Sequence, residues 1–108
     1  YIGSFQSAIE HILNANPKCR VVIVTPIKGY SKNGDTLRVM PETYPDALKE
    51  VAKLYSLPVC DWYYHSGVNE LTLSVYNGDS DELSYKLHPT NAAYERMGIM
   101  LADTIRNI

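Results

Sequence analysis

Apolar residues recur at intervals of three and four in three segments, a spacing that predicts three amphipathic helices. The first should cover residues 4–16, with Ser4 as its N-cap and Pro17 after its end. The second should run from about residue 41 or 44 to 56, and the third from about Pro89 to Ile108. Their apolar faces are Phe5, Ala8, Ile9, Ile12 and Leu13; Tyr44, Ala47, Leu48, Val51, Ala52 and Tyr55; and Tyr94, Met97, Met100, Leu101 and Ile105.

Between these helices lie two segments with the composition of strands. Residues 19–26 contain four consecutive aliphatic residues, which predicts a strand covered on both faces in a parallel sheet. Residues 57–62 (LPVCDW) predict a second, shorter strand, in which an early proline is tolerated. Residues 26–40 are rich in Gly, Asn and Ser and predict a loop. Residues 63–87 predict a long irregular stretch, with a short strand or helical turn where Leu71, Leu73 and Val75 alternate with polar residues.

The expected order is therefore helix, strand, helix, strand, long loop, helix, which is typical of a doubly wound, flavodoxin-like α/β fold. A chain of 108 residues forms one domain at most. Two parallel strands are few for an independent sheet, because the first would lack a neighbour on one side. Residues 1–108 are therefore predicted to be the C-terminal part of one larger domain.

Composition excludes several classes of function. The formal charge of −2 and the absence of a Lys/Arg cluster give no reason to expect a nucleic acid as partner. No apolar run approaches the ~20 residues that span a bilayer, and no signal peptide is visible. The compartment stays undetermined. Cys19 and Cys60 are expected to be two buried free thiols, too far apart along their strands for a disulfide.

The most informative segment runs from Leu87 to Met97 (LHPTNAAYERM). It places His88 at the end of a loop, with Pro89 fixing the start of the following helix. In an α/β fold such a histidine can reach the cleft above the strand ends, where ligands bind. A neutral imidazole is the usual base for activating a serine. On position alone, a simple role for His88 in capping the helix is equally compatible with the sequence.

The pattern His-Pro-x-Asn-x-x-Tyr followed by a terminal amphipathic helix resembles the last conserved block of the SGNH (GDSL-type) hydrolases. The upstream segments match in order: a helix, an aliphatic strand ending in Thr25-Pro26, a helix ending in Tyr55, and a strand similar to the family's "lPvvDl" sequence. The resemblance covers essentially the whole chain. It implies that His88 is the catalytic base of a carboxylic ester hydrolase, deprotonating a serine and later protonating the leaving alcohol.

The same resemblance places the other catalytic groups outside this chain. The family's nucleophile lies in a Gly-Asp-Ser motif, and its oxyanion hole is completed by Gly and Asn residues, all N-terminal to the matched region. The chain by itself is thus expected to be inactive, with the N-terminal half of the same domain as its partner.

The chain departs from the family at the acid. The family carries Asp three residues before the histidine, where this sequence has Tyr85. Either a Ser-His dyad or a substitute acid is then required. Asp79, Asp81 and Glu82 are close in sequence, but none has the family's spacing. The tripeptide Gly78-Asp79-Ser80 has the letters of the nucleophile motif without a preceding hydrophobic strand, and is expected to be a solvated turn.

Four other residues could line the site. His65 and Asp61 lie at or just after the end of the second strand, Tyr85 takes the place of the acid, and Trp62 with its neighbouring tyrosines could stack on a sugar or acyl group. A packing or solvent role is more common for His65, and a structural hydrogen bond for Asp61. The three histidines and two cysteines lack metal-ligand spacing, so we expect neither metal nor cofactor.

Three functions remain open. The first is an esterase acting on a small ester or an acetylated carbohydrate. The second is a non-catalytic binding or structural module derived from the SGNH fold, which Tyr85 would favour. The third is an α/β fragment that associates with a partner chain, or with a second copy, through the open strand edge at Val21–Val24.

Overall fold

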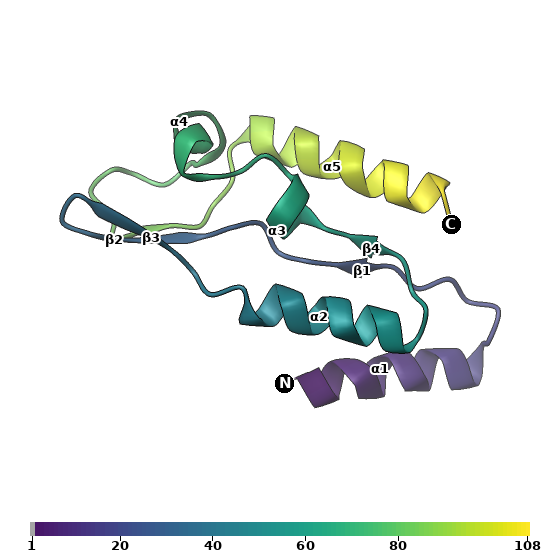
Figure 1. The fold of residues 1–108 in the computed structure, drawn as a ribbon. Coiled ribbons are helices and arrows are strands. Elements are labelled where there is room, and N and C mark those ends of the chain that lie inside the picture. Colours follow the sequence, from purple (N-terminus) through teal and green to yellow (C-terminus); the bar gives the residue numbers. More distant parts are fainter. Residues whose placement is uncertain (1) are drawn as a thin grey trace.

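The computed structural model describes residues 2–108, with two parallel strands at the centre, β1 (Ile23–Val24) and β4 (Val59–Cys60). Helix α2 (Thr43–Leu54) covers one side of this pair, with α1 (Ile2–Ala15) packed beside it, and α5 (Asn91–Arg106) runs along the other side (Figure 1). The described residues thus form a mixed α/β structure, as the hydrophobic pattern predicted. The observed strands are shorter than the predicted ones.

The core lies where α1, α2 and β1 meet. It consists of Ile9, Ile23, Leu48, Val51 and Ala52, each no more than 3% exposed. Three of these five residues belong to the apolar face predicted for the second helix, which explains why that helix is placed well by sequence alone. Burial of such side chains contributes about 1.5–3 kcal/mol each for the larger ones.

A second sheet projects beyond the helices (Figure 1). It is antiparallel, with strand order β3-β2-β5, and its strands are β2 (Tyr30–Asn33), β3 (Thr36–Val39) and β5 (Tyr85–Lys86). The prediction of a loop over residues 26–40 is therefore wrong. Gly34-Asp35 forms the two-residue tip of a hairpin, and Gly34 has φ +64°, a backbone conformation that glycine adopts without strain.

The stretch from 63 to 87 is also more ordered than expected. It contains all but the first residue of α3 (Trp62–His65), together with the 3-10 turn η1 (Glu70–Thr72), α4 (Leu73–Tyr76) and β5. The alternating apolar residues belong to helical turns rather than to a strand, and Leu71 is 90% exposed. Trp62 starts α3 instead of ending the second predicted strand.

The observed helix ends and buried faces differ from the predicted ones in several places. Helix α1 already includes Ser4, so Ser4 is not its N-cap. The N-cap of α5 is Thr90, whose hydroxyl accepts from the Ala93 N–H, so Pro89 lies before the helix rather than in its first turn. Tyr94 and Ile105 were expected on the buried face of α5 but are 55% and 52% exposed.

The strand β1 has one open edge. The N–H groups of Ile23 and Thr25 donate to carbonyls of the β4 segment, so those of Val22 and Val24 face the opposite edge, where no described strand pairs with them. The Cα radius of gyration is 15.8 Å, above the ~13 Å expected for a compact domain of this length. The described residues are thus extended for their number.

Both cysteines are free, but only Cys60 is buried, and the prediction that Cys19 is buried is wrong. None of the helices described is long and apolar enough to cross a membrane.

Candidate functional site

His88 lies between β5 and α5, in a segment that is fixed from one side by the end of α4. The Gly78 N–H donates to the His88 carbonyl at 2.7 Å. Two residues further on, the Thr90 N–H donates to the Tyr76 carbonyl at 2.9 Å, and its hydroxyl donates to the Val75 carbonyl at 2.7 Å. Residues 75–78 therefore hold residues 88–90 in place, and since Thr90 caps α5, His88 has no capping role.

The side chain of Asp79 makes three hydrogen bonds, two with His88 and one with Leu87. Its Oδ1 lies 2.7 Å from Nδ1 of the His88 ring. Its Oδ2 accepts from the backbone N–H groups of Leu87 at 2.6 Å and His88 at 2.9 Å. A single carboxylate thus fixes both the backbone and the ring of the histidine.

Asp79 is ionised over the whole neutral range. The hydrogen bond from the His88 backbone N–H, with further ones from the Leu87 N–H and the His88 ring, lowers the pKa of Asp79 to about 2. Only 7% of its side chain is exposed, against 69% for His88.

These properties assign the tautomer of His88. An ionised carboxylate only accepts, so the 2.7 Å bond requires that Nδ1 of the neutral ring carry the proton. Nε2 then presents its lone pair, and within residues 2–108 no group hydrogen-bonds to it. A carboxylate on Nδ1 and an open Nε2 are the arrangement that a histidine needs in order to activate a nucleophile.

Sequence reasoning missed the role of Asp79. The Gly78-Asp79-Ser80 turn is not merely solvated, because its carboxylate is nearly buried against His88. Its glycine is needed for close approach: a Cβ at Gly78 would lie 3.3 Å from the Pro89 carbonyl oxygen and 3.4 Å from that of His88. The tripeptide matches the nucleophile motif only in residue type. Its contact with His88 depends on how the chain folds between residues 79 and 88, which no local sequence pattern indicates.

Tyr85 occupies the position at which the SGNH family has its acid. Its ring lies edge-on to the His88 imidazole, with centroids 6.1 Å apart. Tyr85 therefore lies beside the histidine, while the carboxylate that contacts the imidazole Nδ1 is that of Asp79.

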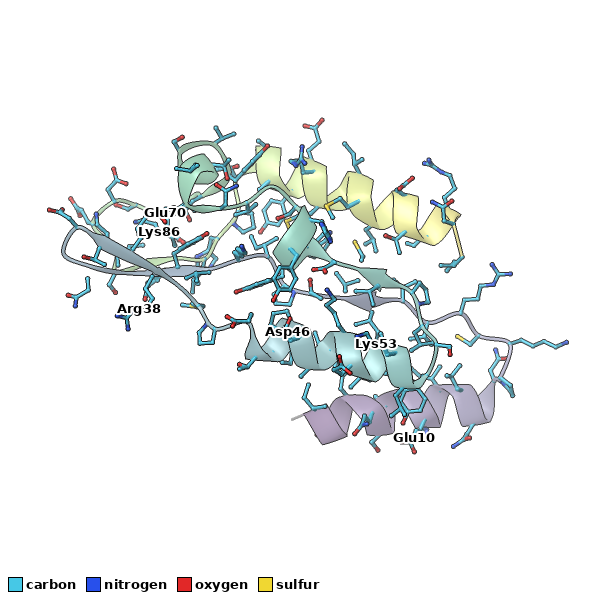
Figure 2. All side chains as sticks on the ribbon, viewed as in Figure 1. Glu10, Arg38, Asp46, Lys53, Glu70 and Lys86 are labelled. Atoms are coloured by element: carbon cyan, nitrogen blue, oxygen red, sulfur yellow. The ribbon has the colours of Figure 1, made fainter. Side chains whose placement is uncertain are left out.

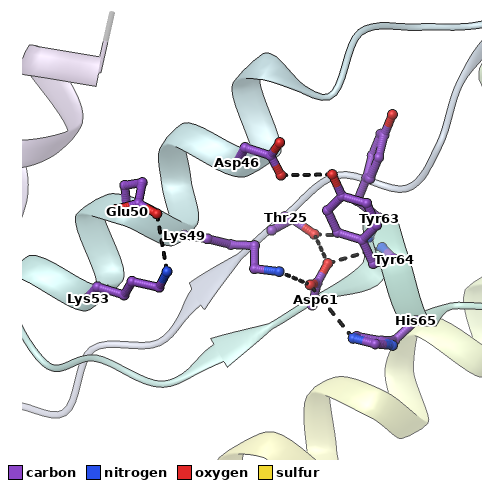
Figure 3. Close-up of polar contacts among 9 residues, drawn as sticks. All are labelled: Thr25, Asp46, Lys49, Glu50, Lys53, Asp61, Tyr63, Tyr64 and His65. Carbon is purple, nitrogen blue, oxygen red and sulfur yellow. Dashed lines mark hydrogen bonds and ion pairs between the residues drawn. The ribbon is translucent and has the colours of Figure 1, made fainter.

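Asp61, at the end of β4, forms a separate polar cluster (Figure 3). Its Oδ1 accepts from the Thr25 hydroxyl at 3.3 Å and the Tyr64 N–H at 3.1 Å, and its Oδ2 pairs with Lys49 Nζ at 2.9 Å. Burial acts to raise the pKa of Asp61, but the Lys49 hydrogen bond and charge and the Tyr64 N–H together lower it. Asp61 thus caps α3 and joins β1, α2 and β4.

The other predicted site residues, His65 and Trp62, contact Asp61 and helix α5 rather than His88. Nε2 of His65 lies 4.0 Å from Asp61 Oδ2, and the imidazole is 72% exposed. The Trp62 indole N–H donates to the Met97 carbonyl of α5 at 3.1 Å. Trp62 therefore serves to pack α3 against α5. None of the hydrogen bonds described joins His65, Asp61 or Trp62 to His88.

A small apolar cleft of about 320 Å³ lies beyond the carboxyl end of β1. It is bounded by the residues after β1, the start of α2, Tyr63 and Leu87, the residue before His88. Among residues 2–108, no group of three or more His, Cys, Asp or Glu side chains is arranged to hold a metal ion.

No family model matches the chain, and neither does any curated protein. Several solved chains are similar, among them one crystal structure with a TM-score of 0.73 and 27% sequence identity. The alignment covers 99% of this chain and 52% of the other. The present chain thus spans about half the length of that structure and shares its fold over this half.

Proposed function

We propose that this chain is the C-terminal, histidine-bearing part of a serine ester hydrolase of the SGNH (GDSL) type. The observation that carries the proposal is the Asp79–His88 pair, with Nδ1 of the imidazole 2.7 Å from the carboxylate and Nε2 open. The His-Pro block and the order of segments before it add the family resemblance.

In the proposed mechanism, Nε2 of His88 removes the proton of a serine hydroxyl as the serine oxygen attacks the ester carbonyl. The imidazolium formed is stabilised by the ionised Asp79 and then gives its proton to the leaving alcohol. A second cycle with water releases the acid. The serine and the oxyanion-binding groups come from the N-terminal half of the domain, so the chain alone is inactive.

Three observations support a missing half. The similar crystal structure has about twice the length of this chain, since 52% of it is covered. The radius of gyration of 15.8 Å exceeds that of a compact domain of 108 residues. The edge of β1 at Val22 and Val24 is free among the described strands and would accept a further parallel strand. A second copy of the chain is the alternative partner for this edge.

The substrate class we propose is a small ester or an acetylated carbohydrate. The apolar cleft beside Leu87 is at the small end of the range for ligand sites and suits a short acyl or aglycone group. Tyr64 is 43% exposed and lies near the cleft-lining Tyr63, and its hydroxyl and the lysines over its ring supply polar groups beside the cleft for a sugar.

The experiment starts from the coding sequence upstream of Tyr1, which should encode a strand ending in Gly-Asp-Ser. The intact polypeptide is then assayed for hydrolysis of p-nitrophenyl acetate and acetylated xylan, and for labelling by a fluorophosphonate. We expect His88→Ala to lower kcat by about 10³-fold or more. His11→Ala, an exposed position on α1, is the matched control and should leave kcat unchanged. An intact protein without labelling or hydrolysis would refute the proposal.

A non-catalytic SGNH-derived module is the second candidate, favoured by Tyr85 at the position of the family's acid. The Asp79–His88 bond weakens this alternative, because a site without catalytic function does not require an ionised, nearly buried carboxylate on its histidine. An inactive intact protein that still binds acetylated xylan would favour the module.

A further inference from the structure

Lys86 is a buried cation beside the Asp79–His88 pair. The residue is 7% exposed, although its charge favours water. Its Nζ donates to the Ser80 carbonyl at 2.7 Å and approaches the Leu83 carbonyl at 3.4 Å. None of the ion pairs found between described residues includes Lys86. In Figure 2, Lys86 lies near Glu70, where the projecting sheet faces the segment that follows α3.

A buried ammonium group is costly unless its hydrogen bonds are needed. The pairing of β5 with β2 does not need it, because the Tyr30–Lys86 and Ser31–Tyr85 register is formed by the backbone. An apolar side chain of similar length would fill the same space without the cost. The function of the charge must then lie in what the amine holds, which is the turn from Ser80 to Leu83.

That turn directly follows the acid. Asp79 binds the backbone of Leu87 and His88, while Lys86 binds the carbonyl of Ser80. Two links therefore run in opposite directions between the same two short segments, 79–83 and 86–88. Asp79 is held on its N-terminal side by the Gly78 N–H bond to the His88 carbonyl and by the Asn77 amide, which donates to the Asp79 carbonyl. On its C-terminal side, removing the Lys86 link would release the Ser80–Leu83 turn.

We propose that Lys86 is a positioning residue for the candidate catalytic pair: its ammonium fixes the Ser80–Leu83 turn and thereby the orientation of Asp79 toward Nδ1 of His88. The inference rests on the proposed hydrolase function and adds a group that acts through Asp79 without touching the substrate. It accounts for a buried lysine that lies next to the acid and pairs with carbonyl oxygens only.

The experiment compares Lys86→Met with wild type in the intact protein. Methionine keeps most of the side-chain length and removes the ammonium. We expect kcat to fall on the order of 10- to 100-fold with KM little changed, because a small misplacement of a catalytic group reduces the rate without altering binding. In the same variant, the ¹⁵N signal of protonated His88 Nδ1 should weaken or shift. Lys18→Met, at an exposed position after α1, is the matched control and should change neither quantity.

A double variant tests the route of the effect. If Lys86 acts through Asp79, Lys86→Met should cause little further loss of kcat in an Asp79→Asn background. Equal losses in both backgrounds would overturn the proposal, as would a Lys86→Met enzyme with wild-type kcat and an unchanged His88 spectrum. If the methionine variant does not fold, Lys86→Leu replaces it, since leucine fills part of the same space and cannot donate to either carbonyl. Full kcat in that variant would equally overturn the proposal.

Failure of this inference is distinguishable from failure of the proposed function. If the intact wild-type protein hydrolyses no ester, the proposed function fails, and the ¹⁵N spectrum of His88 still decides whether Lys86 positions the pair. If wild type is active and the Lys86 variants are as well, only the inference fails.

Discussion

The carboxylate of Asp79 lies 2.7 Å from Nδ1 of His88, although nine positions separate the two residues in the sequence. The SGNH family places its acid three positions before the histidine, where Tyr85 stands here. The difference is made possible by β5, which pairs with β2 between the two residues and lets the chain return to the same place. A longer loop thus delivers a carboxylate to the ring nitrogen that the family's acid would bind.

The first prediction concerns this bond. In the intact protein, Asp79→Asn should lower kcat by up to about 10⁴-fold, because an amide can donate to Nδ1 and stabilise the wrong tautomer of His88. Steady-state kinetics and the ¹⁵N spectrum of the imidazole measure the two effects. Asp81→Asn, a neighbouring exposed aspartate, is the control and should retain full activity. Comparable losses in both variants would show that Asp79 has no special role.

The second prediction concerns Tyr85, which stands where the SGNH family has its acid. With Asp79 present, Tyr85→Asp should raise kcat by less than about threefold, because Nδ1 of His88 already has its acceptor. In the Asp79→Asn background, the same change should restore a large part of the lost kcat, since it returns an acid to the family's spacing. A large gain in the otherwise unchanged protein would mean that Asp79 does not serve as the acid.

The sequence was sufficient for elements whose signal is periodic. Leu48, Val51 and Ala52 follow the helical repeat and are buried as that repeat requires, so α2 was placed correctly. The aliphatic run before Thr25 likewise identified β1 as a strand in a parallel pair.

The hairpin of β2 and β3 and the partner of His88 could not be predicted from periodicity, because each depends on which segments pair in the fold. The Gly34-Asp35 dipeptide is a hairpin signal, but the polar strands on both sides of it have no apolar alternation, so the local pattern favours a loop. The partner of His88 could not be found either. Asp79, Asp81 and Glu82 all carry a carboxylate close to His88 in sequence. Only the fold of residues 79–88 brings one of them, Asp79, into contact with the His88 imidazole.

The third prediction concerns acid stability. The hydrogen bonds from His88 and Leu87 lower the pKa of Asp79 to about 2, below the ~3.9 of an unfolded aspartate. Because the folded state binds this proton more weakly, the bonds contribute fully to stability above pH ~4, and the contribution is lost as pH falls through about 2. The difference in unfolding free energy between wild type and Asp79→Asn should therefore shrink as the pH falls below about 4. A pH-independent difference in urea unfolding would contradict this account.

The fourth prediction concerns the Asp61 cluster, which joins β1 to β4. Thr25 is 1% exposed, and its hydroxyl donates to Asp61 at 3.3 Å while accepting from the Tyr63 N–H at 3.0 Å. Thr25→Val keeps the shape but leaves the Tyr63 N–H unpaired and removes a donor from Asp61. We expect a loss of about 1–3 kcal/mol in unfolding free energy, measured by urea denaturation.

The control for this change is Thr36→Val, which makes the same chemical replacement at an exposed position of β3. It should alter the unfolding free energy by less than about 0.5 kcal/mol. Equal effects at the two positions would mean that the Thr25 hydroxyl contributes nothing specific. Because none of the described hydrogen bonds joins the Asp61 cluster to His88, Thr25→Val should leave kcat unchanged at temperatures where the protein is folded. A fall in kcat in the folded variant would instead reveal that the cluster is coupled to His88.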